Sequence, residues 1–177
     1  MKEFFKHNRV AAFAALLVII ALSLTLGVNR SVGKLANELA SIYTSGSAEY
    51  GSAEKDVKKF CTYFNELYGL ITSDSISRPA YSADLSRMAS SPFCNANLLS
   101  KAYADASADY NRFINTPGID DSVRNEAIRS FAELQAIQLR IKNNLIYNTA
   151  AEEYNKALAA FPASILDFLH SPAAVFD

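Results

Sequence analysis

The sequence predicts an all-α protein in which an N-terminal transmembrane helix precedes an antiparallel, up-and-down four-helix bundle with long helices. Three observations lead to this prediction. Residues 10–28 form an apolar run of 19 residues without a charge. Apolar residues in the rest of the chain recur at steps of three and four, which is the spacing of one helix face. The 177 residues include only 6 Gly, 5 Pro and no Trp, a composition that favours helices over an all-β fold.

The apolar run 10–28 is interpreted as a transmembrane signal anchor, because a helix needs about 20 apolar residues to cross a bilayer. Residues 1–9 are expected to be a short cytoplasmic N-terminus, since basic residues outnumber acidic ones there and give a weak positive-inside bias. A cleaved secretory signal is the alternative, but its apolar stretch is shorter and it ends at a small-x-small site, which residues 26–29 lack. A buried soluble helix would carry a polar face, and none interrupts the run.

The anchor helix is expected to continue past the membrane, because apolar residues at helical spacing follow through residues 32–42. Glycines and serines within 46–52 weaken a helix and predict a kink or a short break there. A second apolar series at residues 57–71 then predicts the next helix. Residues 72–91 are rich in Ser and show no clear period, so we expect a long connection with one helical turn at residues 83–88.

A third helix is expected after Ser91 and Pro92, which resemble a cap followed by proline in the first turn. It ends at residues 115–118. A fourth and longest helix is predicted at residues 120–161, with Asp120 among its cap candidates. One line on this helix repeats every seven residues, as in coiled-coil packing, and consists of Ala127, Leu134, Ile141, Asn148 and Asn155.

The C-terminal fifteen residues are too apolar for a free tail. We expect a short helix at residues 163–170 that docks on the bundle, followed by an extended end after Pro172. The preceding Pro162 must end the long helix, because proline lacks a backbone donor.

A seven-residue register in the C-terminal third resembles a known signature. Its residue pairs are Tyr147 and Asn148, Tyr154 and Asn155, and Phe161 and Pro162. This pattern, together with the long helix before it, is similar to the C-terminal signature of the LemA family. The similarity covers residues 127–176, whereas the family's usual Trp after the anchor and its Arg-Arg…Leu-Ile-Pro-Asn-Leu stretch are absent.

The resemblance implies a divergent LemA family member with a LemA-like helical bundle at residues 29–177. It also implies a bacterial membrane protein without an established enzymatic activity. Together with the charge bias of residues 1–9, this leads us to expect a single-pass protein of the inner membrane with the bundle outside the cytoplasm. The expected partners are the lipid bilayer and other proteins, including a homo-oligomer. The formal net charge of −1 argues against nucleic acid, which needs a basic surface.

Asn148 and Asn155 lie on the same line as Leu134 and Ile141, so their side chains are expected to be buried. A buried amide must find hydrogen-bond partners, because an unsatisfied one costs about 1–3 kcal/mol. Two interpretations stay open for the signature residues: polar groups that fix helix packing, and a surface that binds a partner.

The chain contains few residues with catalytic or metal-binding chemistry. Its only histidines are His7 and His170, and it contains no HExxH, CxxC, GxSxG or phosphate-binding glycine loop. We therefore expect no catalytic residue, no metal and no cofactor. Asp105 and Asp109, one helical turn apart, are interpreted as part of a solvated face.

Cys61 and Cys94 are the only cysteines. They could form a disulfide in an oxidising compartment, or remain free and buried as small core residues.

These observations favour a membrane-anchored bacterial envelope protein whose bundle is a scaffold or interaction module without catalysis. The alternative is an extracytoplasmic small-ligand sensor that works through a partner protein, because nine residues cannot hold an output domain. A serine hydrolase is disfavoured, since no base accompanies any serine.

Overall fold

The computed structural model describes residues 2–47, 50–73, 76–93, 95–160, 164 and 170–176. This part of the chain contains six helices and no extended strand, which confirms the all-α prediction. The helices are α1 (Lys2–Ser45), α2 (Ala53–Ile71), α3 (Ser82–Met88), α4 (Ala96–Ile114), α5 (Asp121–Lys142) and α6 (Leu145–Ala159).

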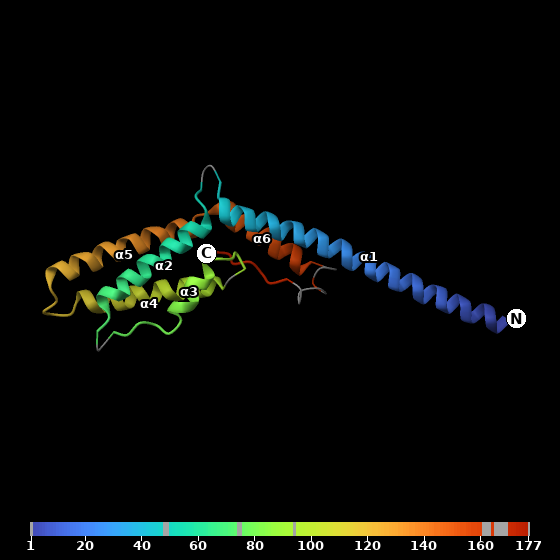
Figure 1. The fold of residues 1–177 in the computed structure, drawn as a ribbon, viewed down its shortest axis with the longest axis horizontal. Coiled ribbons are helices and arrows are strands. Elements are labelled where there is room, and N and C mark those ends of the chain that lie inside the picture. Colours follow the sequence, from blue (N-terminus) through green and yellow to red (C-terminus); the bar gives the residue numbers. More distant parts are fainter. Residues whose placement is uncertain are drawn as a thin grey trace.

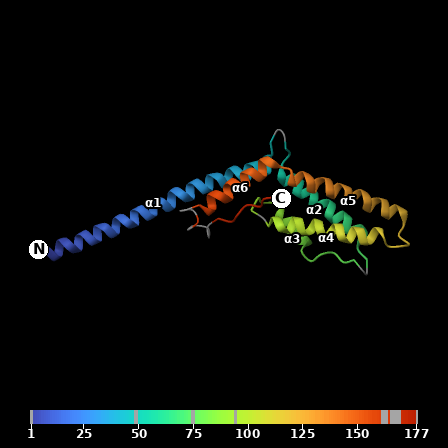
Figure 2. The same cartoon turned by 180° about the vertical axis from the view of Figure 1, so that it is seen from behind.

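The helices form two arms that meet at a corner (Figures 1 and 2). In one arm, α6 packs along the C-terminal part of α1. In the other arm, α2 packs along α5, while α4 contacts both of these helices and α3 covers α2. The N-terminal part of α1 extends beyond the packed helices (Figure 1).

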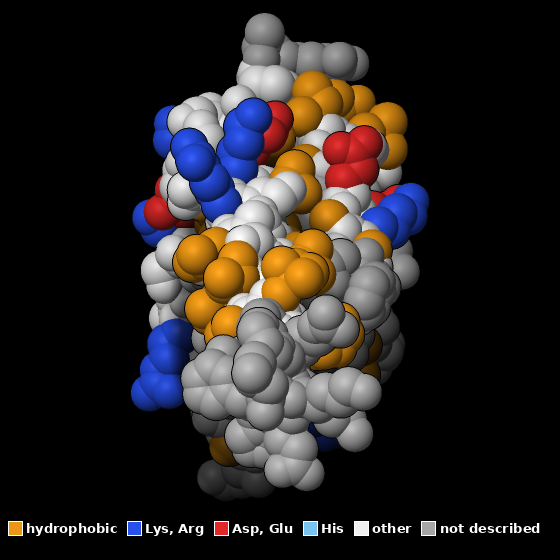
Figure 3. Space-filling view, turned by 90° about the vertical axis from the view of Figure 1, so that its right-hand side faces the viewer, with side chains coloured by type: hydrophobic (Ala, Val, Ile, Leu, Met, Phe, Trp, Pro, Cys, Tyr) orange, Lys and Arg blue, Asp and Glu red, His pale blue; other side chains and the backbone are white. Residues whose placement is uncertain are grey.

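Helix α1 confirms the prediction of a long apolar helix near the N-terminus. Its 44 residues span about 66 Å at 1.5 Å per residue. Phe13–Ser45 contains an apolar stretch of 18 residues, none of which is buried. In the described part of the chain, α1 is therefore the one helix that is long and apolar enough to cross a membrane. Hydrophobic side chains face outward when the molecule is viewed from the N-terminal end (Figure 3). Along α1, Val28 is the first side chain that packs partly against the core, and Val32, which is 3% exposed, is the first that is buried in it.

The predicted break after the anchor helix is confirmed between α1 and α2. Gly46 has a φ of 70°, in the left-handed region, and a Cβ on this residue would lie 2.6 Å from the carbonyl carbon of Gly51. Ser52 then caps α2: its hydroxyl accepts a hydrogen bond from the Lys55 amide and donates one to the Tyr43 carbonyl. The serine thereby joins the end of α1 to the start of α2.

The single long helix predicted at residues 120–161 is wrong. The structure divides this stretch into α5 and α6, because Asn144 caps a new helix: its Oδ1 accepts from the Tyr147 amide at 3.2 Å. Its Nδ2 also donates to the Gly51 carbonyl at 3.4 Å, across the break between α1 and α2. Asparagine side chains compete with the backbone in this way and favour helix starts over helix interiors. The two breaks therefore lie side by side and together form the corner.

The start of the third predicted helix is also corrected. Helix α4 begins at Ala96 and is capped by Asn95, whose side chain accepts from the Asn97 amide at 3.1 Å, so Ser91 and Pro92 precede the helix. The predicted cap of α5 is confirmed, since Asp120 accepts from the Ser122 amide at 2.8 Å. The turn expected within residues 72–91 is α3.

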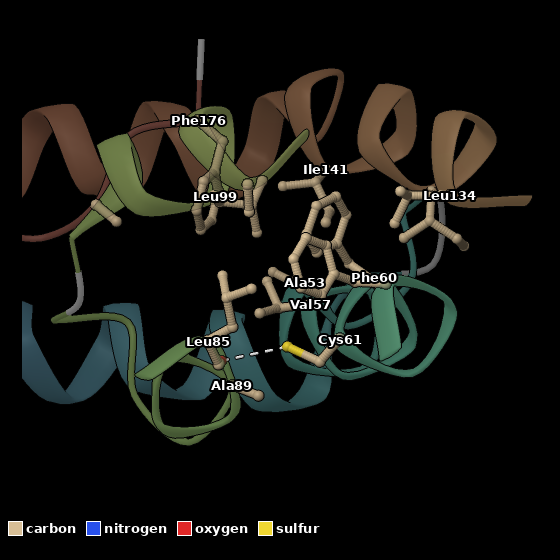
Figure 4. Close-up of a cluster of buried hydrophobic side chains, with 14 of the residues drawn as sticks. Ala53, Val57, Phe60, Cys61, Leu85, Ala89, Leu99, Leu134, Ile141 and Phe176 are labelled. Carbon is tan, nitrogen blue, oxygen red and sulfur yellow. Dashed lines mark hydrogen bonds between the residues drawn. The ribbon is translucent and has the colours of Figure 1, made fainter. Parts of the chain in front are cut away.

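The core of the second arm is built mainly by α2, whose predicted apolar series is buried. Phe60 and Phe64 are fully buried, and Leu134 and Ile141 of α5 face this helix (Figure 4). Phe176, near the C-terminus, also enters this cluster, where it lies beside Leu99 of α4.

Candidate functional site

Four of the signature residues come together on α6 and hold residues 171–176, which we call the C-terminal segment. We call these four residues the clamp: Tyr147, Asn148, Tyr154 and Asn155. Tyr147, Asn148 and Tyr154 are buried, and Asn155 is half-buried. The segment is also covered, since Ala173, Ala174 and Phe176 are each less than 7% exposed.

Each asparagine of the clamp forms a reciprocal pair with one residue of the segment. Asn155 Nδ2 donates to the Ala173 carbonyl at 3.0 Å, and its Oδ1 accepts from the Ala173 amide at 2.8 Å. Asn148 makes the same two bonds to Phe176, both at 3.0 Å. An asparagine amide carries a donor and an acceptor side by side, so it satisfies both backbone groups of one residue.

The seven-residue spacing of the two asparagines matches the geometry of the segment. Seven residues of helix advance about 10.5 Å, and three residues reach that distance only when the chain is almost fully extended. Ala173 pairs with Asn155 and Phe176 with Asn148, so the segment runs opposite to α6 in an extended form. This agrees with the extended end expected after Pro172.

The tyrosines of the clamp add hydrogen bonds to the same main chain. The Tyr147 hydroxyl donates to the Ala174 carbonyl at 2.9 Å, and the Tyr154 hydroxyl donates to the Ser171 carbonyl at 3.1 Å. Burial raises the pKa of Tyr154, so its hydroxyl stays protonated and keeps its donor. The Ala174 amide donates in turn to the Pro92 carbonyl at 3.0 Å, which ties the segment to the loop before α4.

Aromatic rings surround the clamp. The Tyr147 ring lies between Tyr43 of α1 and Phe176 of the segment, with centroid distances of 5.5 and 5.4 Å. The Tyr154 ring packs on Phe93 at 5.4 Å. These contacts hold the hydroxyls in place.

The structure therefore supplies partners for both asparagines, although only Asn148 is buried as expected. They are main-chain groups of the C-terminal segment, which sequence spacing alone does not reveal. Phe161 and Pro162, the last signature pair, lie outside the described residues. The short helix predicted at residues 163–170 falls almost entirely outside them too.

Asp105 and Asp109 are not the solvated face predicted from the sequence. Both are half-buried and accept hydrogen bonds from tyrosine hydroxyls: Tyr81 donates to Asp105, and Tyr68 donates to Asp109 at 2.7 Å. Burial, followed by these carboxylates, raises the pKa of Tyr68 and of Tyr81. The hydroxyls therefore stay neutral and join α2 and the loop before α3 to α4. No spacing in the sequence predicts these hydrogen bonds between the tyrosines and the aspartates.

A groove and a smaller hollow lie among the described residues of the second arm and its corner. An open groove of about 580 Å³ runs between α2 and α5, and its charged lining consists of Glu66, Glu126, Arg129 and Glu133. A smaller hollow of about 310 Å³ lies at the corner beside Asp56 and Arg140. Arg140 Nη2 lies 2.8 Å from Asp56 Oδ1, yet burial outweighs this cation and raises the Asp56 pKa.

Cys61 is a buried, free thiol whose Sγ donates to the Leu85 carbonyl at 3.2 Å (Figure 4). Burial raises its pKa to about 11, which keeps the thiol protonated and unreactive near neutral pH. Cys94 lies outside the described residues, so of the two alternatives left open for the pair the structure describes only the free, buried Cys61.

Within the described residues, no group of three or more His, Cys, Asp or Glu side chains is arranged to hold a metal ion. His170 Nε2 lies 2.9 Å from Asn29 Oδ1 of α1, where His170 is half-buried and Asn29 is exposed.

The chain was compared with protein-family models, with curated proteins and with solved structures, and no match was found.

Proposed function

We propose that this chain is a membrane-anchored interaction protein of the bacterial inner membrane, a divergent LemA-like protein without catalytic activity. The anchor spans residues 10–28, and the packed helices lie outside the cytoplasm. The observation that carries the proposal is the continuity of α1, because one helix is both unburied and apolar in its N-terminal part and packed against α6 in its C-terminal part. A rigid connection of this kind holds the packed helices at a fixed distance from the bilayer.

The register of the clamp supports the LemA-like part of the proposal. The Tyr–Asn pairs that carry the resemblance are the residues that hold the C-terminal segment. We also include in the proposal the antiparallel four-helix arrangement predicted from the sequence, whose four members are the C-terminal part of α1, α2, α4 and the stretch of α5 and α6.

The corner offers a surface for a protein partner. Leu139, Leu145 and Ile146 are 50%, 63% and 37% exposed, and they lie on both sides of the break between α5 and α6. The hollow of about 310 Å³ opens beside Leu139. Exposed apolar side chains beside a polar hollow are typical of protein interaction sites.

Site-specific photo-cross-linking in cells tests this surface. A photoreactive residue at Leu145 is expected to give one discrete adduct. The same residue at Ile128, an apolar position of α5 that is 43% exposed, is the matched control. The substitution Leu139→Asp should remove the Leu145 adduct without changing helicity. Equal, diffuse labelling at both positions would count against an interaction surface at the corner.

The small-ligand sensor is the second candidate, and the groove between α2 and α5 favours it. A volume of about 580 Å³ lies within the range of small-molecule sites. A ligand that binds this groove would raise the melting temperature of the purified chain, and the substitution Arg129→Ala would cancel the increase. A ligand-dependent shift that survives this substitution would exclude the groove as the sensor site.

A further inference from the structure

We propose that the clamp is a peptide-binding site that also accepts the C-terminal segment of a second copy of this chain. In the structure the chain fills the site with its own segment. Exchange of segments between copies would join two chains through the same contacts.

The clamp recognises the main chain of its ligand. The two asparagines bind the amide and carbonyl groups of Ala173 and Phe176, and the two tyrosines bind carbonyl groups of Ser171 and Ala174. A peptide that is presented in an extended form therefore meets every donor and acceptor of the site, whichever molecule supplies it.

Side chains of the ligand matter at three positions. Ala173 and Ala174 are 6% and 3% exposed, so the site admits only small side chains there. Phe176 is 4% exposed, stacks on Tyr147 and lies beside Leu99 in the core, so an aromatic residue is needed at this position. The ligand is thus an extended segment with two small residues, then one intervening residue, then an aromatic one.

A second copy of the chain is an occupant that meets these requirements, because it carries the same residues 171–176. Residues 160–170 connect α6 to the segment, and eleven residues can reach about 36 Å when extended. Exchange replaces each contact with an identical one, which makes it a low-cost route to a dimer. The resident segment competes at a high effective concentration, so exchange is favoured where that segment is weakened or where copies are crowded.

Complementation between two full-length variants tests the proposal. The first carries Asn148→Leu and Asn155→Leu, which removes the clamp and keeps the segment. The second carries Ala173→Pro and Phe176→Ala, which removes one backbone donor and the aromatic anchor and keeps the clamp. The two are tagged differently, mixed in detergent and co-purified. We expect at least tenfold more co-purification from this mixture than from either variant mixed with a differently tagged copy of itself.

A labelled peptide of residues 170–177 gives the second measurement. It should bind saturably to the full-length Phe176→Ala variant, which keeps the clamp, and should not bind to the Asn148→Leu variant. The single variant Asn148→Leu also replaces the double variant Asn148→Leu, Asn155→Leu in the co-purification if that double variant does not fold. Variants that retain helical circular dichroism but neither associate nor bind the peptide would overturn the proposal. Both measurements use purified protein in detergent. Their outcome is therefore independent of the proposed location of the protein in the bacterial inner membrane.

Discussion

At the residue scale, two asparagines on α6 determine where the end of the chain lies. Each lies at a position that a coiled-coil pattern reserves for an apolar side chain, and each makes two hydrogen bonds to one residue of the C-terminal segment. Replacing either amide leaves a backbone amide and a backbone carbonyl without partners. The cost of such a change comes from desolvated groups rather than from lost packing.

We therefore expect Asn148→Leu to lower the free energy of unfolding by about 1–3 kcal/mol, since it leaves both backbone groups of Phe176 unpaired. Urea denaturation of the detergent-solubilised chain measures this change. Asn125→Leu, at an exposed position of α5, is the matched control and should be close to neutral. Equal effects at the two positions would show that the hydrogen bonds to Phe176 contribute no stability.

Cys61 gives a prediction for alkaline pH. Its pKa is about 11 in the folded chain and 9.0 for an unperturbed thiol, so only the unfolded state loses this proton at first. The contribution of Cys61 to stability is thus fully present below pH 9 and is lost as the pH rises through about 11. In a Cys94→Ser background, Cys61→Ala should show a smaller fall in the free energy of unfolding between pH 9 and pH 11. Identical pH profiles with and without the thiol would contradict this assignment.

At the element scale, the corner is the feature that divides the chain into two arms. Gly46 and Ser52 break one side, and Asn144 breaks the other and bonds across to Gly51. Arg140 reaches Asp56 at the same place. Because the two breaks face one another, the chain changes direction at the same place between α1 and α2 and between α5 and α6. The pairs α1 with α6 and α2 with α5 therefore each remain packed.

Gly46→Ala should be destabilising by more than about 1 kcal/mol, because the residue has a positive φ and its new Cβ would meet backbone atoms of Gly51 and Ser52 at 2.6 Å. Gly69→Ala is the control: it lies within α2 with nothing within 4 Å of the new Cβ, and should stabilise by about 0.5–1 kcal/mol. Thermal denaturation of the two variants compares them. A neutral Gly46→Ala would mean that the corner tolerates a different turn.

At the scale of the whole molecule, α1 joins an apolar surface to a packed helical body. Phe13, Leu16 and Ile19 are more than half exposed, whereas Val32, Leu39 and Tyr43 of the same helix are buried. A continuous apolar surface of this size is unfavourable in water and favourable in the hydrocarbon core of a bilayer. The sequence thus places an exposed apolar part and a packed part of one helix in succession, as the proposed membrane anchor requires.

The combined substitution Ile19→Lys and Ile20→Lys should move the protein from the membrane pellet to the supernatant after alkaline extraction. Each lysine near the bilayer centre costs roughly 2.5–3.5 kcal/mol of insertion free energy. Ile128→Lys adds a lysine at an exposed apolar position of α5 and should leave the protein in the pellet. A doubly substituted chain that resists extraction would argue against the membrane role of α1.

The sequence by itself determined the helical class, the apolar helix near the N-terminus, the break at 46–52 and the core face of α2. These features depend on local composition and on periodicity, which neighbouring residues carry. The α5–α6 break escaped prediction because apolar spacing runs through Asn143 and Asn144 without interruption. Tertiary structure alone decided the partners of Asn148 and Asn155, the burial of Asp105 and Asp109, and the path of the C-terminal segment. Hydrogen bonds between distant residues leave no period in a sequence, because their geometry exists only when the helices are packed.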